Sequence, residues 1–147
     1  MANTHLKHNA TDYADALICE AEGLERLASA LDEAGVTGIG VPRVHRVDEN
    51  ELEITAIQSS GASDQTRAVL GEGLARMHAL RQKAYGWGRD NYIGLSLQPN
   101  RWCDSWGEFF VRERLGYQVS RIRDTGQRSR FQKVLDEYGV TLIDWLN

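Results

Sequence analysis

The sequence has little cysteine and proline, and it has no long apolar run. Its 147 residues include 2 Cys and 2 Pro. Cys19 and Cys103 lie far apart, outside the spacings of zinc sites or disulfide frameworks. No stretch approaches the roughly 18 apolar residues of a membrane-spanning helix, and the N-terminus has no apolar signal segment. We therefore expect a cytoplasmic protein with no membrane partner.

Positive charge is also scarce. The chain has 17 Lys and Arg against 21 Asp and Glu, a net charge of -4. Proteins that bind nucleic acids neutralise phosphates with a surplus of cations, so we expect no nucleic-acid partner. His5 and His8 have no third ligand near them in the sequence, so no zinc site is expected either.

What is present is a set of clear periodic segments. Residues 5–7 end a short strand, and apolar residues at three- and four-residue steps predict a helix over 11–33. Gly35 is suited to end that helix. Alternating segments then predict a β-hairpin with strands at 43–47 and 51–57.

The later half of the chain is predicted to be helical around one long loop. A helix over 64–82 is followed by a loop that begins an aromatic-rich stretch, residues 84–110. Ser105 and Glu108 have the spacing of a capping box, which predicts a helix with Trp106, Phe109 and Phe110 in the core. A short final helix is expected over 128–138.

Lys7 and Glu20 are the most informative charged pair. A lysine on a strand and a glutamate on the next helix, with a hairpin after them, is the order in which protein-kinase-like folds begin. In those folds the glutamate holds the ammonium, which binds the α- and β-phosphates of ATP. Spacing alone favours two solvated surface charges. If Lys7 and Glu20 form such a pair, we expect the Lys7 ammonium to be buried and bonded to the helical carboxylate across a small sheet.

Several segments, in order, resemble the fructosamine/ketosamine-3-kinase family. The resemblance spans about residues 5–127 and is carried by ICEAEGLERLA, VPRV, LGEGLARMHAL, YGWGRDNYIG, LQPNRW and WGEFFVRERLGYQVSRI. It implies ATP-dependent phosphorylation of sugar-amine adducts. It also implies a fold similar to aminoglycoside phosphotransferases and protein kinases, with ATP and Mg²⁺ as cofactors.

The same resemblance suggests the site residues. Lys7 matches the nucleotide-binding lysine and Glu20 its partner, with Glu22 as the alternative if the register shifts. The backbone of the hinge between the lobes would bind adenine. The family commonly has a glutamate where this sequence has Thr55. The hinge residues are Thr55, Ala56 and Ile57. The polar loop residues that could face the sugar-amine substrate are Asp90, Asn91, Tyr92, Gln98 and Asn100.

The expected fold class is α+β, a partial protein-kinase-like fold. Residues 1–60 would form a partial N-terminal nucleotide-binding lobe with its hinge, and residues 61–147 the start of the helical C-terminal lobe. The glycine-containing loop before Lys7 and the family's His-Gly-Asp-Leu-Trp catalytic loop have no match in this sequence. We therefore expect no catalytic or metal-binding residue in the chain.

Two functions follow from these expectations. The first is a truncated ketosamine kinase that is not competent alone. The alternative is a non-catalytic, pseudokinase-like binding protein. In either case, apolar surface left uncovered on the helix at 106–122 predicts a homodimer or another protein partner.

Overall fold

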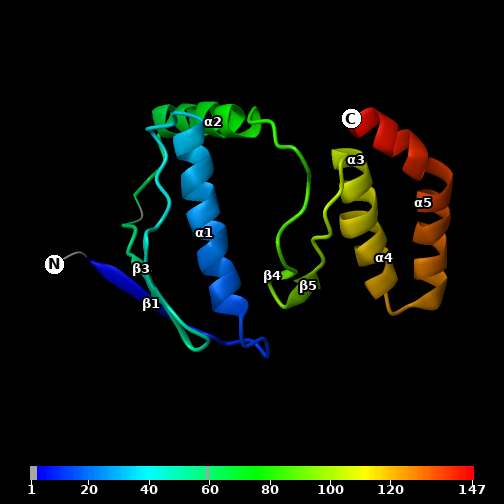
Figure 1. Ribbon diagram of the computed structural model, residues 1–147, viewed down its shortest axis with the longest axis horizontal. Coiled ribbons are helices and arrows are strands. Elements are labelled where there is room, and N and C mark those ends of the chain that lie inside the picture. The colour runs from blue at the N-terminus through cyan, green and yellow to red at the C-terminus, as the bar shows by residue number, and fades with distance from the viewer. Residues whose placement is uncertain (1–2, 59) are drawn as a thin grey trace. The chain divides into compact units, whose positions relative to one another are not determined.

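The computed structural model describes residues 3–58 and 60–147 and divides the chain into two compact units. The first unit runs to Arg81 and the second from Gln82 to Asn147. Strands and helices occur in both units (Figure 1), which confirms the α+β class. The assignment of residues 1–60 and 61–147 to two kinase lobes stays a prediction.

The first unit is built on a three-stranded antiparallel sheet. Its strands are β1 (Thr4–His8), β2 (Val44–Val47) and β3 (Glu51–Thr55), in the order β1-β3-β2. Lys7 in β1 lies directly opposite Leu52 in the central strand. The predicted strands are confirmed, with ends that differ from the prediction by no more than two residues.

Helix α1 (Ala16–Glu33) covers one face of this sheet (Figure 1). Leu17 and Ala21 of the helix form the core with the fully buried Leu52. Partly buried side chains of the sheet pack against this core, namely Val44, Val47 and Ile54. The apolar stripe predicted from the sequence therefore faces the sheet.

Helix α1 begins later than predicted because local side-chain bonds hold the preceding residues in a turn. The Asn9 side-chain oxygen accepts hydrogen bonds from the backbone N–H of Thr11 at 3.0 Å and from its hydroxyl at 2.8 Å. Such bonds compete with helical ones. At the other end Gly35 has a φ of +63°, the left-handed conformation that favours glycine, and it stops the helix as predicted.

Helix α2 (Asp64–His78) completes the first unit and contacts α1. The Ser63 hydroxyl accepts a hydrogen bond from the backbone N–H of Thr66 at 3.1 Å. This bond satisfies one of the free donors of the first turn. The helix ends four residues before the predicted 82, at a C-cap formed by Ala79.

The second unit opens with a segment that was predicted to be a plain loop but contains a small hairpin. Strands β4 (Asn91–Ile93) and β5 (Ser96–Gln98) pair antiparallel around Gly94, whose φ is +59°. Tyr85 and Cys103 exchange backbone hydrogen bonds of 2.8 and 2.7 Å. These two pairings tie both ends of the segment together.

A single helical rod follows the hairpin. It consists of α3 (Trp106–Phe109), the π-helical η1 (Phe110–Gly116) and α4 (Tyr117–Arg121). The Ser105 hydroxyl accepts from the backbone N–H of Glu108 at 3.1 Å, which confirms the predicted helix start. Wide π turns are rare in helices and often occur near functional sites.

Helix α5 (Thr125–Leu146) packs against this rod and runs back along it (Figure 1). It is about twice as long as the helix predicted over 128–138. Phe109 is buried, as predicted, whereas Trp106, also predicted to be core, is 37% exposed. No helix within the described ranges is long and apolar enough to cross a lipid bilayer.

Candidate functional site

The structure brings Lys7 and Glu20 together in the first unit. The ammonium nitrogen lies 2.5 Å from Glu20 Oε2, so Glu20 and not the alternative Glu22 is the carboxylate that the structure shows bonded to Lys7. The two side chains are 45% and 38% exposed. The expectation of a buried ammonium was therefore wrong.

The fold itself determines this contact. Lys7 and Leu52 are directly opposed on neighbouring strands, so their side chains leave the sheet on the same face, the one that α1 covers. Glu20 precedes the buried Ala21 and follows Leu17 by one helical turn. The packing of α1 on the sheet thus places the Glu20 carboxylate beside the edge strand β1.

The exposure of this pair has a chemical consequence. An exposed ion pair contributes at most about 1 kcal/mol, because water screens it and two long side chains lose freedom. The Lys7 ammonium can therefore exchange part of its contact with Glu20 for a phosphate oxygen at low cost. The geometry fits a phosphate ligand held in reach of solvent.

The hinge residues follow at the end of β3. The backbone N–H of Thr55 donates to the Arg43 carbonyl at 2.9 Å, and that of Ala56 donates to the Asn3 carbonyl at 2.9 Å. These two donors are engaged within the sheet. Ile57 comes after the strand and its side chain is 68% exposed, so it is the predicted hinge residue best placed to meet a ligand.

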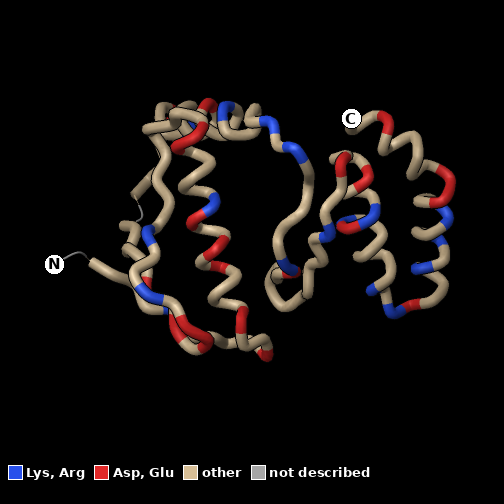
Figure 2. The backbone as a smooth tube through the Cα atoms, viewed as in Figure 1, with Lys and Arg blue, Asp and Glu red and all other residues tan. Residues whose placement is uncertain are grey.

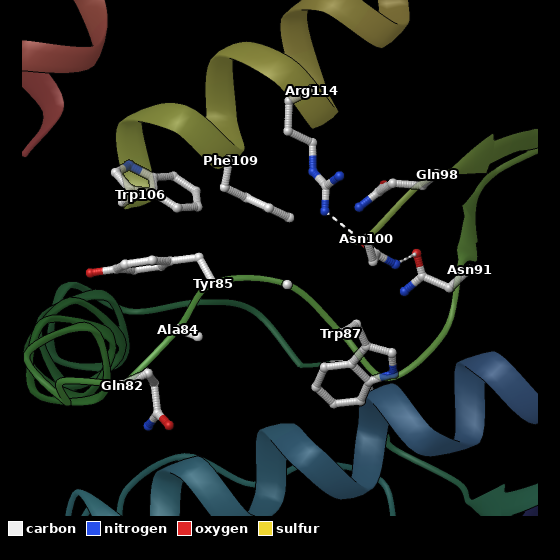
Figure 3. A pocket seen from close by; sticks show the side chains of 11 residues that line it. Gln82, Ala84, Tyr85, Trp87, Asn91, Gln98, Asn100, Trp106, Phe109 and Arg114 are labelled. Atoms are coloured by element: carbon white, nitrogen blue, oxygen red, sulfur yellow. Dashed lines mark hydrogen bonds between the residues drawn. The ribbon is translucent and has the colours of Figure 1, made fainter. Parts of the chain in front are cut away.

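The second unit contains an open cavity of about 320 Å³. Figure 3 shows Tyr85, Trp106 and Phe109 directed toward it, with Arg114 beside them. The Tyr85 and Trp106 rings lie 5.8 Å apart between centroids. Further lining comes from Gln82, Trp87, Asn91, Gln98 and Asn100. An aromatic wall that faces several amides can hold a polyhydroxylated ligand.

Arg114 in η1 connects the helical rod to the hairpin segment. Its guanidinium donates to the Pro99 carbonyl and to the Asn100 side-chain oxygen, both at 2.6 Å, and it lies 4.4 Å above the centre of the Phe109 ring. With its amide oxygen turned toward the guanidinium, Gln98 accepts a further bond at 2.8 Å. These bonds, together with one to the Glu113 carbonyl, occupy the guanidinium. Arg114 therefore has a structural role and is not a free anion ligand.

Asp90 and Asn100 make most of the other bonds of this structural network, which also includes Gln98 and Asn91. The Asp90 side chain accepts a hydrogen bond from the backbone N–H of Asn100 at 2.9 Å. The Asn100 amide group donates to the Arg89 carbonyl at 3.1 Å and to the Asn91 side-chain oxygen at 2.8 Å, and Asn100 is only 3% exposed. These bonds assign Asp90 and Asn100 a role in holding the loop.

The other three predicted substrate residues lie nearby. Asn91 and Gln98 line the cavity from opposite strands of the hairpin (Figure 3), whereas Tyr92 is not among the residues that line it. Sequence reasoning placed Phe109 in the core, which its 5% exposure confirms, but it did not connect Tyr85 and Trp106 with a cavity. The signal was present in the crowding of aromatic residues over 84–110.

We expect Asn100→Ala to destabilise the second unit by about 2–4 kcal/mol. The change removes three partly buried hydrogen bonds, to Arg114, to the Arg89 carbonyl and to the Asn91 side chain. The measurement is chemical unfolding of the whole chain, followed by tryptophan fluorescence. Ser96→Ala, at an exposed position in the same hairpin, is the control and should stay within about 0.5 kcal/mol of the parent. Equal stability of the two variants would contradict the structural role of Asn100.

Arg114 and Cys103 in the second unit have shifted pKa values. Burial lowers the pKa of Arg114, and the neighbouring Glu113 carboxylate opposes that shift. Burial, with added repulsion from Glu113 and Glu108, raises the pKa of the Cys103 thiol. A thiol with a raised pKa is a poor nucleophile near neutral pH. Residues 3–58 and 60–147 contain no group of three His, Cys, Asp or Glu side chains placed to hold a metal ion.

Comparison with known proteins gives a consistent result. The family model described as fructosamine kinase matches residues 2–142. Protein-ribulosamine 3-kinase of Arabidopsis thaliana is 37% identical over 112 residues, 71% of this chain and 33% of that protein. A probable ketoamine kinase of Synechocystis is 47% identical over 55 residues, 37% of this chain and 19% of that protein.

Solved structures show the same fold. A putative fructosamine-3-kinase from Thermobifida fusca has a TM-score of 0.76 at 24% identity, over 92% of this chain and 48% of the other. One from Haemophilus somnus has a TM-score of 0.64 at 21% identity over the same shares. This chain thus spans about half the length of these structures, and less of the curated relatives.

Proposed function

Because the chain belongs to the fructosamine kinase family, we propose that its first unit binds ATP through Lys7. The observation that carries the proposal is the half-exposed contact between the Lys7 ammonium and the Glu20 carboxylate. Glu20 orients the ammonium, and Lys7 then donates to the α- and β-phosphate oxygens as in other kinase folds. This chemistry needs an ammonium that is both positioned and accessible.

The adenine would bind at the end of β3. Since the N–H groups of Thr55 and Ala56 donate within the sheet, the donor to the base would be the backbone N–H of Ile57. Main-chain recognition of this kind does not depend on the side chain at Thr55. The departure from the family's usual glutamate is therefore compatible with adenine binding.

Phosphoryl transfer by this chain alone is not part of the proposal. Transfer requires an aspartate that orients the attacking hydroxyl and acidic or amide ligands for Mg²⁺. The 147 residues contain no His-Gly-Asp segment. Mg²⁺ would accompany ATP, and the residues described here assign it no protein ligand. A pseudokinase-like binding role stays the alternative prediction.

The sugar-amine substrate class is proposed to contact the cavity of the second unit. Aromatic rings stack on the apolar faces of sugars, and amide groups bond to their hydroxyls. The amide oxygens of Asn91 and Gln98 are bonded to Asn100 and Arg114, so their NH2 groups would donate to the sugar, with Tyr85 and Trp106 as the aromatic platform. Asp90 and Asn100 hold the loop in place, and a contact of Tyr92 with the substrate stays a prediction. We also propose a cytoplasmic location, because Cys19 and Cys103 are free thiols and the cytoplasm keeps thiols reduced.

Titration calorimetry of the whole chain with ATP and Mg²⁺ tests nucleotide binding. We expect saturable heat with ATP and at least tenfold weaker binding of inorganic phosphate, which lacks the adenine. A parallel titration with a ketosamine such as fructosyl-lysine tests the cavity. No heat with ATP would refute the nucleotide proposal, and no heat with the ketosamine would refute the assignment of the cavity.

A further inference from the structure

The cavity of the second unit has a polar side built from two amides of the hairpin. Asn91 in β4 and Gln98 in β5 are directly opposed, so their side chains leave the hairpin on the same face, and both line the cavity. The Asn91 oxygen accepts from the Asn100 amide group at 2.8 Å, and the Gln98 oxygen, turned toward Arg114, accepts at 2.8 Å. Both oxygens are thus engaged, and the NH2 groups remain for a ligand.

Arg114 fixes the orientation of both amides. A guanidinium has five N–H donors and no acceptor. It donates directly to Gln98 and to the Asn100 oxygen, and Asn100 in turn donates to Asn91 (Figure 3). Reversal of either amide would place its NH2 group against another donor, at the cost of a partly buried bond. Arg114 therefore orients Gln98 directly and Asn91 through Asn100.

The charges around the cavity are of one sign. Strands β4 and β5 carry no charged residue (Figure 2), and among residues 3–58 and 60–147 the lining includes no Asp or Glu. The Glu113 carboxylate, next to Arg114 in the chain, is paired with Arg101 at 3.2 Å and lies outside the lining. A cation that enters would therefore meet fixed donors and the like charge of Arg114.

The aromatic wall does not reverse this preference. Aromatic faces attract cations, but the Arg114 guanidinium already lies 4.4 Å above the centre of the Phe109 ring. The Trp106 ring is centred only 5.9 Å from that of Phe109, so a second cation there would be repelled by Arg114. The rings of Tyr85 and Trp106 are thus left for the apolar C–H faces of a sugar.

On the basis of the sugar-amine function proposed above, we propose that the cavity takes the polyol end of the sugar and rejects its protonated amine. Hydroxyl oxygens accept hydrogen bonds from the NH2 groups of Asn91 and Gln98, whereas an ammonium has donors only. The amine and the group attached to it then lie outside the cavity. Asn91 and Gln98 determine this specificity, and Arg114 is a positioning residue that acts through them.

Two matched ligands test the proposal. Mannitol ends in two hydroxyl groups, and 1,6-diamino-1,6-dideoxymannitol ends in two ammonium groups near neutral pH. Dissociation constants are measured by ligand-observed NMR titration of the full chain. We expect mannitol and fructosyl-lysine each to bind at least about tenfold more tightly than the diamine, because each offers a polyol end without an ammonium.

Gln98→Glu should reverse the preference between mannitol and the diamine. The new side chain still accepts from Arg114, but an oxygen replaces the NH2 group that faced the ligand. Asn91→Asp makes the same exchange beside Asn100 and should act in the same direction. Gln118→Glu is the control, because it adds the same charge at an exposed position of α4 outside the lining and should keep the parent preference. A general loss of structure would weaken both ligands alike and would not reverse their order.

Arg114→Lys tests the positioning role, because it keeps the charge but has too few donors in fixed positions to hold both amides. The preference for mannitol should narrow to about threefold, and an unchanged preference would contradict this role. A parent chain that binds the diamine as tightly as mannitol would overturn the inference but leave the cavity as a sugar site. So would Gln98→Glu and Asn91→Asp variants that keep the parent preference. A parent chain that binds neither mannitol nor fructosyl-lysine would overturn the assignment of the cavity itself.

Discussion

Lys7→Ala is expected to weaken ATP binding about a hundredfold. The change removes the ammonium that would donate to two phosphate groups, and hydrogen bonds to charged groups contribute about 1.5–3 kcal/mol each. It leaves the core formed by Leu17, Ala21 and Leu52 unchanged. Titration calorimetry with ATP and Mg²⁺ measures the loss. A melting temperature close to that of the parent chain would show that the fold is retained.

Glu20→Gln separates orientation from charge. The amide still reaches Lys7 but no longer attracts the ammonium, so we expect a smaller loss, about tenfold. Arg26→Gln is the matched control, because it removes another exposed ion pair of α1, Arg26 to Glu33 at 2.7 Å, and should leave ATP binding unchanged. ATP affinity that is equal in all three variants would refute a phosphate-binding role for Lys7.

The elements that local chemistry determines could be predicted from the sequence. Alternation over 51–57 predicted β3, and the caps at Ser63 and Ser105 predicted where α2 and α3 begin. The contact of Lys7 with Glu20 was expected from the order of strand, helix and hairpin together with the family resemblance, not from a local pattern. The strand and the caps depend on residues that are close in sequence.

The features that depend on distant residues could not be predicted. The bonds of Asn100 to residues 89–91 and to Arg114 join segments that no local pattern connects. The same is true of the bond that the Asp90 carboxylate accepts from the backbone N–H of Asn100. The length of α5 was underestimated because Gly139, Val140 and Thr141 are weak helix formers, whereas packing against α3 carries the helix on to Leu146.

The second large effect is expected at the contact between α3 and α5. A Cβ added at Gly107 would lie 2.5 Å from the Ile143 carbonyl oxygen and 2.8 Å from its Cα. Both atoms belong to the backbone of α5, so the helix would have to move as a whole. We expect Gly107→Ala to destabilise the chain by about 3 kcal/mol, measured by urea unfolding.

Gly139→Ala is the matched control, because the residue lies on α5 in the same helix pair. A Cβ there would meet only Val111, at an ordinary contact distance of 3.7 Å. Alanine is favoured over glycine within a helix by about 1 kcal/mol, so this variant should be slightly more stable than the parent. The two Gly-to-Ala changes are thus expected to have opposite signs. A gain in stability from Gly107→Ala would mean that α3 and α5 do not approach as closely as the structure shows.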